Sequence, residues 1–389
     1  MMNKRLILPT IIALGLPHLA AAALPPTALP RLPTPPVQVS VNHPLRFPNA
    51  FGSHPQYPLE WWYITGHLQS QSGQPLGFQI TFFRLLPAQV WDNPSAFNPR
   101  QIYFAQAAIS DPRIGHLLTA QRIARAGMGL AGAKKDVTEV WIDHWSLRQK
   151  GAKYRARIDA QSIAYDLHFQ ATQPPLLEGP DGVSQKGPDP ANASYYYSIP
   201  QLRVAGSVQI DGKVQRVQGK AWLDHEWSTA YLPKQAVGWD WMGINLANGG
   251  ALMLFQMRKA DGRALWLEGT WRHANGRVQY LHGTQISLQP LRFWQSPKTG
   301  NRYPVAWRVQ IPGLQFTLQP LMNDQEFEAT RSTGSVYWEG AVRAIGEDAR
   351  PLGSGYLELT GYGGRLQMGL GQSASAKHHT AGRTMDIRK

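Results

Sequence analysis

Residues 163–169 read Ile-Ala-Tyr-Asp-Leu-His-Phe, with the large apolar side chains on alternate positions. Successive side chains of a β-strand point to opposite faces, so this spacing predicts a strand with one buried face. Looser alternation marks residues 154–158, 305–311 and 314–318. Pairs that favour hairpin turns separate such stretches: Asp181-Gly182, Asp211-Gly212, Asp261-Gly262 and Asn275-Gly276. The pattern therefore predicts an all-β protein of hairpin-joined strands, folded as a barrel or a sandwich.

Helical periodicity is weak throughout the chain. Residues 121–135 come nearest to it, and no segment keeps the pattern for longer than about three turns. We therefore expect no substantial helix, and residues 121–135 are the one candidate for a short one.

The chain also contains an internal repeat. Without a gap, a shift of 177 positions superposes Trp62 on Trp239, Gly66 on Gly243, Gly73 on Gly250, Phe78 on Phe255 and Gln79 on Gln256. Towards the end of each copy the shift falls to 140 and then 136, which superposes Tyr197 on Tyr337 and Gly219 on Gly355. A repeat of this length predicts a duplicated domain. We expect two similar antiparallel β-domains, at residues 49–230 and 233–370.

Both ends of the chain read as segments outside these domains. Lys4 and Arg5 precede an apolar stretch at residues 6–20 and three alanines at 21–23, which is typical of a cleavable secretory signal peptide. The stretch is short for a bilayer span, so an uncleaved anchor is the weaker alternative. Eight prolines within residues 24–48 predict an extended linker, and residues 371–389 predict a disordered basic tail. We expect a secreted, periplasmic protein.

Composition excludes several kinds of chemistry. The 389 residues include no cysteine, which rules out disulfides, cysteine–zinc sites, iron–sulfur clusters, a thiol nucleophile and a lipoprotein anchor. The 39 Lys and Arg against 25 Asp and Glu give a net charge of +14, but the basic residues form only small groups. Because nucleic-acid binders gather such residues on one face, we expect no nucleic-acid partner. An anionic membrane surface fits a basic secreted protein better.

Six motifs stand in order along the chain: Glu60–Tyr63, Gly77–Arg84, Trp222–Ser228, Gly238–Trp241, Tyr337–Gly340 and Gly355–Tyr362. Together they resemble the lipocalin-like family of carotenoid 1,2-hydratases (hydroxyneurosporene synthases) and their AttH relatives. The resemblance covers residues 50–365 and implies two lipocalin-like barrels in tandem. It also implies a secreted bacterial protein, often encoded beside permeases of ABC-type lipoprotein exporters. Some members of the family hydrate a terminal carotenoid double bond, and many have no assigned reaction.

Hydration of an isolated alkene needs a strong proton donor, which a carboxylic acid kept protonated by burial can supply. Alternation over residues 219–224 puts Trp222 and Asp224 on one face, where an aromatic ring could stabilise a carbocation if that face lines the barrel lumen. By resemblance, the family's acid is an Asp that precedes a His, which here corresponds to Asp224 and His225. The family pattern has a Tyr where this chain has Trp222, which puts the proton relay in doubt. The second copy has Thr360 opposite Asp224, so we expect any chemistry in or beside the first domain.

A purely structural role competes with this hypothesis. The aromatic residues Trp61, Trp62, Trp222 and Trp227 could close barrel ends, with Asp224 and Glu60 accepting backbone or indole N–H groups. Arg84 or Arg203 could be the basic residue that closes a small lipocalin-like barrel.

Metal binding is not expected, and no cofactor is predicted. Adjacent strand residues face opposite ways, so neither Asp143-His144 nor Asp224-His225-Glu226 is expected to chelate one ion. His54 and His67 could join a site only if the fold brings them close. The Gly-x-Ser-x-Gly hydrolase motif and Gly-rich phosphate loops are absent.

Two functions remain open. The preferred one is a lipocalin-like protein that binds an apolar lipid or isoprenoid in a barrel mouth or between the domains, possible partners being an ABC-type envelope transporter and the membrane surface. The alternative is a hydro-lyase of the carotenoid 1,2-hydratase type, with Asp224, Trp222 and His225 as catalytic residues. Candidate ligand-binding residues in either case are Trp61, Trp62, Tyr63, Trp227, Trp239, Trp241, Tyr337 and Trp338.

Overall fold

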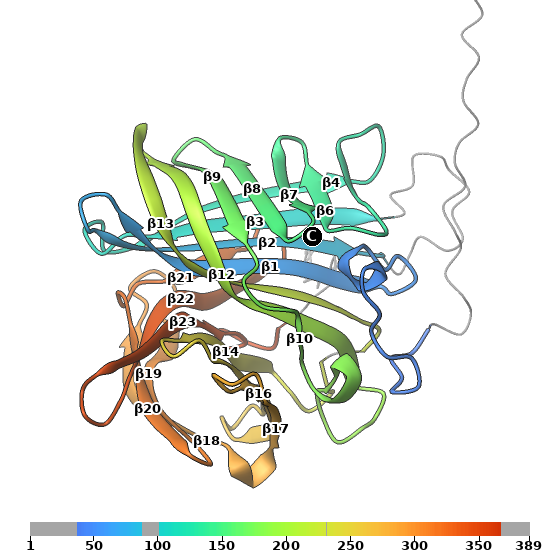
Figure 1. Cartoon of the computed structure of the whole chain (residues 1–389), viewed down its shortest axis with the longest axis vertical. Helices are drawn as coiled ribbons and strands as arrows, with labels where there is room; N and C mark the ends of the chain where they lie inside the picture. Colours follow the sequence, from blue (N-terminus) through green and yellow to red (C-terminus); the bar gives the residue numbers. More distant parts are fainter. Residues whose placement is uncertain (1–36, 88–100, 231, 367–389) are drawn as a thin grey trace, which may run out of the picture. The chain divides into compact units, whose positions relative to one another are not determined.

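The computed structural model describes residues 37–87, 101–230 and 232–366, which form two antiparallel β-sheets (Figure 1). The predicted signal peptide and the predicted basic tail lie outside the described residues. Among the described residues, no helix has the length and apolar character needed to cross a membrane. In the part of the chain that the structure describes, helical structure is limited to short 3₁₀ turns: η1 (Asn49–Phe51), η3 (Pro180–Gly182) and η4 (Gly283–Gln285).

The first sheet curls into a nearly closed barrel. Its strands follow the order β4-β3-β2-β1-β13-β12-β9-β8-β7-β6-β5, and the short β10 (Leu176–Leu177) and β11 (Val183–Gln185) pair with β12. The strands on the main path are β1 (Leu59–Ser70), β2 (Pro75–Leu85), β3 (Ile102–Ser110), β4 (Leu117–Arg125), β5 (Ala131–Ala133), β6 (Glu139–Ile142), β7 (Trp145–Lys150), β8 (Lys153–Asp159), β9 (Ile163–Gln170), β12 (Ala193–Ile210) and β13 (Lys213–Ser228). The quoted stretch 163–169 lies within β9, with its apolar side chains buried as predicted.

The second sheet has the order β17-β16-β15-β14-β23-β22-β20-β19-β18, with β21 (Glu326–Ala329) paired to β22. Its strands are β14 (Gly238–Leu246), β15 (Ala251–Arg258), β16 (Ala264–Arg272), β17 (Val278–His282), β18 (Ser287–Gln295), β19 (Arg302–Ile311), β20 (Leu314–Pro320), β22 (Ser335–Ile345) and β23 (Pro351–Leu359).

The two strand orders confirm the duplication. Strands β1–β4 of the first sheet correspond to β14–β17 of the second, and β13, β12, β9, β8 and β7 correspond to β23, β22, β20, β19 and β18. The first barrel has two additional strands, β5 and β6, in its sheet. The prediction of two tandem lipocalin-like barrels is therefore confirmed.

The ungapped shift of 177 positions, however, is wrong as an alignment of single residues. Trp62 and Ile64 point into the core of the first barrel, and Met242 and Ile244 point into the core of the second. Even-numbered residues thus face inward on both β1 and β14. An odd shift superposes inward Trp62 on Trp239, which packs outside the second core.

The candidate helix at residues 121–135 is also wrong. Residues 117–125 form β4, which pairs with β3 along its whole length. Gly127 and Gly129 then adopt positive φ angles in the turn that leads to β5. Pairing with a buried neighbouring strand outweighs the weak helical pattern.

Arg84 closes the end of the first barrel, as one of the two predicted candidates. It lies opposite Glu60 in the β1–β2 ladder, and its Nε donates to Glu60 Oε2 over 2.8 Å. Its Nη2 donates to the carbonyl oxygens of His54 and Tyr57, which tie the segment before β1 across the barrel end. Both members of the ion pair are fully buried. The other candidate, Arg203, is exposed on β12.

We predict that Arg84→Ala lowers the free energy of unfolding by about 3–5 kcal/mol, because it leaves the Glu60 carboxylate buried without its cation. Arg203→Ala is the matched control and should change it by less than about 0.5 kcal/mol. Urea denaturation followed by tryptophan fluorescence measures both. Equal effects would contradict a closing role for Arg84.

Candidate functional site

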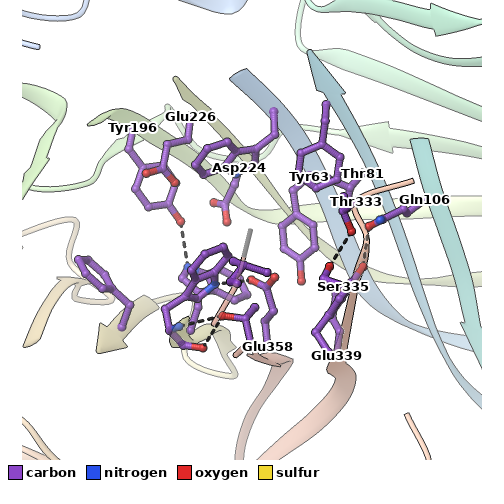
Figure 2. A pocket seen from close by; sticks show the side chains of 18 of the residues that line it. Tyr63, Thr81, Gln106, Tyr196, Asp224, Glu226, Thr333, Ser335, Glu339 and Glu358 are labelled. Carbon is purple, nitrogen blue, oxygen red and sulfur yellow. Dashed lines mark hydrogen bonds between the residues drawn. The ribbon is translucent and has the colours of Figure 1, made fainter. Parts of the chain in front are cut away.

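The outer faces of the two barrels line a shared, partly open pocket (Figure 2). Aromatic side chains make up much of its lining: Trp61, Tyr63, Tyr196, Trp239, Trp241 and Phe255. Hydrogen bonds between the barrels hold it together. Trp241 Nε1 donates to the Tyr196 hydroxyl over 3.0 Å, and the Tyr337 hydroxyl donates to Gln106 Oε1 over 2.6 Å.

Strand β13 presents Asp224 to this pocket from the first barrel. Trp222 and Asp224 do share a face, as predicted, because Trp222 Nε1 donates to Asp224 Oδ1 over 2.6 Å. That face is the outside of the barrel, whereas Ala221 and Leu223 point into its core. The condition that this face lines the lumen is therefore not met, and Asp224 lies between the domains.

The hydrogen bonds of Ser198 show that a neutral carboxylic acid is present here. Ser198 Oγ lies 2.5 Å from Asp224 Oδ1 and 2.7 Å from Glu178 Oε1. A hydroxyl carries one hydrogen and can donate it to only one of these oxygens. The other contact is a hydrogen bond only if that carboxyl is protonated and donates to Ser198. Asp224 and Glu178 therefore hold at least one proton between them.

Burial explains why the proton stays. Removal from water raises the pKa of Asp224 well above its usual range, and the nearby Glu178 carboxyl raises it further. Burial also raises the pKa of Glu178 to about 7. Burial therefore favours the protonated form of Asp224, which adjoins a cavity lined with aromatic rings.

The second barrel supplies two more carboxyls, which the sequence analysis missed. Glu339 on β22 and Glu358 on β23 lie directly opposite each other in the β22–β23 ladder and both line the pocket (Figure 2). Burial and the neighbouring Glu358 raise the pKa of Glu339 well above its usual range, and burial raises the pKa of Glu358 to about 7. The pocket thus lies beside the first domain and is lined by carboxyls of both barrels.

One ion pair lies in the same pocket. Lys186 Nζ is 2.9 Å from Glu226 Oε1, and both side chains are at least nine-tenths buried. The ammonium group also lies 4.3 Å from the centre of the Phe255 ring and 5.0 Å from that of Tyr196. Because this pair cancels its own charge and much of the lining is aromatic, the pocket suits a largely apolar ligand.

The predicted aromatic ligand contacts divide into two groups. The five that line the pocket are Trp61, Tyr63, Trp239, Trp241 and Tyr337. The other three lie in the barrel cores: Trp62 and Trp227 in the first and Trp338 in the second. These three tryptophans therefore have a structural role, in a barrel end or core, and do not line the pocket.

His225 also lies inside the first barrel, on the opposite face from Asp224. Its Nε2 is 2.9 Å from Glu60 Oε1, and its Nδ1 is 3.1 Å from the Tyr197 hydroxyl. A carboxylate only accepts, so Nε2 carries the hydrogen and Nδ1 accepts from Tyr197. Burial lowers the pKa of His225 to about 4, which leaves it neutral. It cannot exchange protons with a molecule in the pocket.

The fold does bring His54 close to His225, as the sequence analysis required for a metal site. One ligand atom each from His54, Glu60 and His225 lie within 4.8 Å of one another. Arg84 already supplies the positive charge that balances Glu60, so a metal is not needed for charge balance. The other candidate pair, Asp143 and His144, is on the surface, and Asp143 pairs with Arg122.

A family model described as AttH-like matches residues 38–362. The chain belongs to this family. Among solved structures, a protein of Nitrosomonas europaea assigned to AttH is 42% identical, with a TM-score of 0.78, over 84% of this chain and 99% of that one. Kievitone hydratase of Nectria haematococca shares the fold at 15% identity, with a TM-score of 0.61 over 81% of this chain and 91% of that one.

Two curated fungal enzymes are similar in sequence to the AttH-like chain. Kievitone hydratase of Fusarium solani is 25% identical over 54% of this chain and 60% of its own length. A dehydratase of Emericella nidulans is 25% identical over 46% of this chain and 52% of its own length. The matches thus span little more than half of these relatives.

We predict that Asp224→Asn makes the AttH-like protein more stable than wild type as the pH rises. A folded-state pKa raised above the unfolded value of about 3.9 means that wild type loses stability above pH 4, by up to about 1.4 kcal/mol per pH unit, until Asp224 ionises. The neutral amide has no such loss. Urea denaturation of both proteins between pH 4 and 8 measures the divergence. Parallel stability curves would show that Asp224 is not held protonated.

Proposed function

We propose that this AttH-like protein is a hydro-lyase that adds water to, or removes it from, a carbon–carbon double bond of a neutral, mainly apolar substrate held between its barrels. The observation that carries the proposal is Asp224, a buried acid that lines an aromatic pocket and whose pKa burial raises well above its usual range. A group of this kind is the donor that alkene protonation requires.

The surroundings of Asp224 suit such a reaction. Trp222 donates to Asp224 Oδ1, which also contacts Ser198, so the acid is held in place at the pocket wall. Protonation of a trisubstituted alkene by Asp224 would leave a tertiary carbocation. The faces of Trp241 and Tyr63 line the same pocket and can stabilise that charge through their quadrupoles. Trp222, at the position where the family pattern has a Tyr, thus donates a hydrogen bond to the acid.

The curated relatives support the reaction class, since one is a hydratase and the other a dehydratase. They do not decide the substrate. The resemblance noted in the sequence favours an acyclic carotenoid, and the relative's name offers kievitone as a second probe. Both are neutral or weakly acidic molecules with large apolar parts, as the pocket requires.

A carrier function is the second candidate. The pocket is largely aromatic, and its one ion pair, Lys186 with Glu226, is internally balanced. Such a cavity could hold an isoprenoid or lipid without changing it. Native mass spectrometry of protein purified from its own envelope separates the two ideas, because a carrier retains an unaltered ligand and a hydro-lyase converts it.

We predict that the protein hydrates an acyclic carotenoid or kievitone and that Asp224→Asn lowers kcat at least about 100-fold, because the proton donor is lost. Product formation is followed by chromatography with mass detection. Asp211→Asn, in the turn between β12 and β13 and outside the pocket, is the control and should keep full activity. Activity that survives Asp224→Asn would reject Asp224 as the acid.

We further propose that the chain is exported and works at an envelope membrane. Three exposed apolar side chains, Ile123, Met128 and Leu130, lie close in sequence to the basic residues Arg125 and Lys135. Exposed apolar side chains beside basic ones suit contact with a membrane of anionic lipids. A protein bound there could also meet a transporter in the same membrane.

We predict that the exported protein begins at Leu24, because a signal peptidase would cut after Ala23. N-terminal sequencing of the periplasmic fraction after expression of the whole chain measures this. A protein that stays in the cytoplasm with residues 1–23 attached would contradict export.

A further inference from the structure

We propose that Glu339 and Glu358 of the second barrel act as one proton-sharing carboxyl pair that activates the water opposite Asp224. The inference rests on the proposed hydro-lyase function and deepens it. It assigns the second barrel a catalytic part in a reaction whose acid belongs to the first.

The ladder between β22 and β23 fixes the pair. Glu339 and Glu358 are direct cross-strand partners, so their Cβ atoms are about 4.5–5.5 Å apart. Both side chains point out of the barrel core into the pocket, where no cation is paired to either carboxyl among the described residues. Two buried carboxyls this close cannot both ionise, so the pair keeps one proton and offers one carboxylate.

Unsatisfied polar atoms mark where a water or hydroxyl group would bind. Glu339 Oε1 and the Tyr63 hydroxyl are both buried, and within the described ranges neither makes a hydrogen bond of normal geometry. The two groups are close enough to each other that each raises or lowers the other's pKa. They come from different barrels and reach the same pocket (Figure 2). A buried polar atom is costly to leave unpaired, so together they form a subsite for an oxygen that both donates and accepts.

Glu358 is held differently and is the more firmly positioned of the two. Its Oε2 accepts from Trp239 Nε1 over 3.0 Å. This bond stabilises a carboxylate on Glu358. Glu339 therefore holds the shared proton and faces the water, and it passes that proton to Glu358 as it takes one from the water. Tyr63 then orients the water through its hydroxyl.

The protons balance across the pocket. Asp224 gives its proton to one alkene carbon, where a C–H bond forms from the π electrons and the other carbon becomes cationic. The water oxygen forms a C–O bond to that carbon and loses a proton to the Glu339–Glu358 carboxylate. Asp224 ends ionised and the pair ends doubly protonated, so one proton must return to Asp224 before the next cycle. Dehydration is the same sequence in reverse.

The protonation of the pair also depends on the other titratable groups that face Glu339 and Glu358. From the first barrel these are Tyr63 on β1, Asp224 and Glu226 on β13, and Lys186 after β11; from the second they are Asp240 on β14, Tyr337 on β22 and Tyr356 on β23.

The first test needs no substrate. Infrared titration of the whole protein follows the carbonyl stretch of protonated carboxyls between pH 5 and 9. Glu358→Gln should lower the pKa of Glu339 by at least one unit, because it removes the competing charge, whereas Glu347→Gln, an exposed acid, should change nothing. A Glu339 titration that is the same with and without Glu358 would overturn the shared proton.

The second test uses turnover of an acyclic carotenoid or kievitone. Glu339→Gln should lower kcat by about 10²–10⁴-fold with little change in KM, Glu339→Asp should restore part of it, and Glu358→Gln should shift the pH–rate profile. Tyr63→Phe should lower kcat less than Glu339→Gln. Full activity of Glu339→Gln would refute its role even if Asp224 proves essential. If wild type converts neither probe, the hydro-lyase proposal fails, and the infrared titration alone decides whether the pair shares a proton.

Discussion

The desolvation of carboxyl groups between the two barrels is the constraint on which the site depends. Each barrel fills its own core and then buries part of its outer face against the other, which takes Asp224, Glu339 and Glu358 out of water. A charged carboxylate is costly in such a place, so the acids stay protonated or share protons. A single barrel of this fold would expose the same residues to solvent, and their pKa values would return towards the ordinary range.

Duplication therefore does more than enlarge the protein. The two barrels have the same strand order, yet they differ in what they bring to the shared face. The first contributes Asp224, backed by Trp222 and Ser198, and the second contributes the cross-strand carboxyls. In the first barrel the ionised carboxylate, Glu60, is matched by Arg84 and serves to close the barrel. A buried glutamate thus has a structural role beside Arg84, whereas the glutamates of the pocket are the ones to which we assign chemistry.

Much of the fold could be predicted from the sequence, because alternation and hairpin turns are local signals. Residues 163–169 and the face shared by Trp222 and Asp224 are examples. The direction of that face could not be predicted, since residues 221–228 of β13 are buried on both sides and alternation no longer separates inside from outside. Glu339 and Glu358 were missed for a related reason: 19 positions separate them, and only the ladder and the docking of the second barrel bring them to the pocket. The one sequence signal for these two glutamates was that they stand near Tyr337 and Tyr356, in two of the motifs that carry the family resemblance.

The most direct test of this account is a crystal structure of Asp224→Asn with an acyclic carotenoid or kievitone bound, since loss of the acid should trap the unreacted molecule. The account predicts that the ligand lies between the barrels, with its double bond beside position 224 and facing Glu339 across the pocket. A ligand found inside the lumen of either barrel would contradict it.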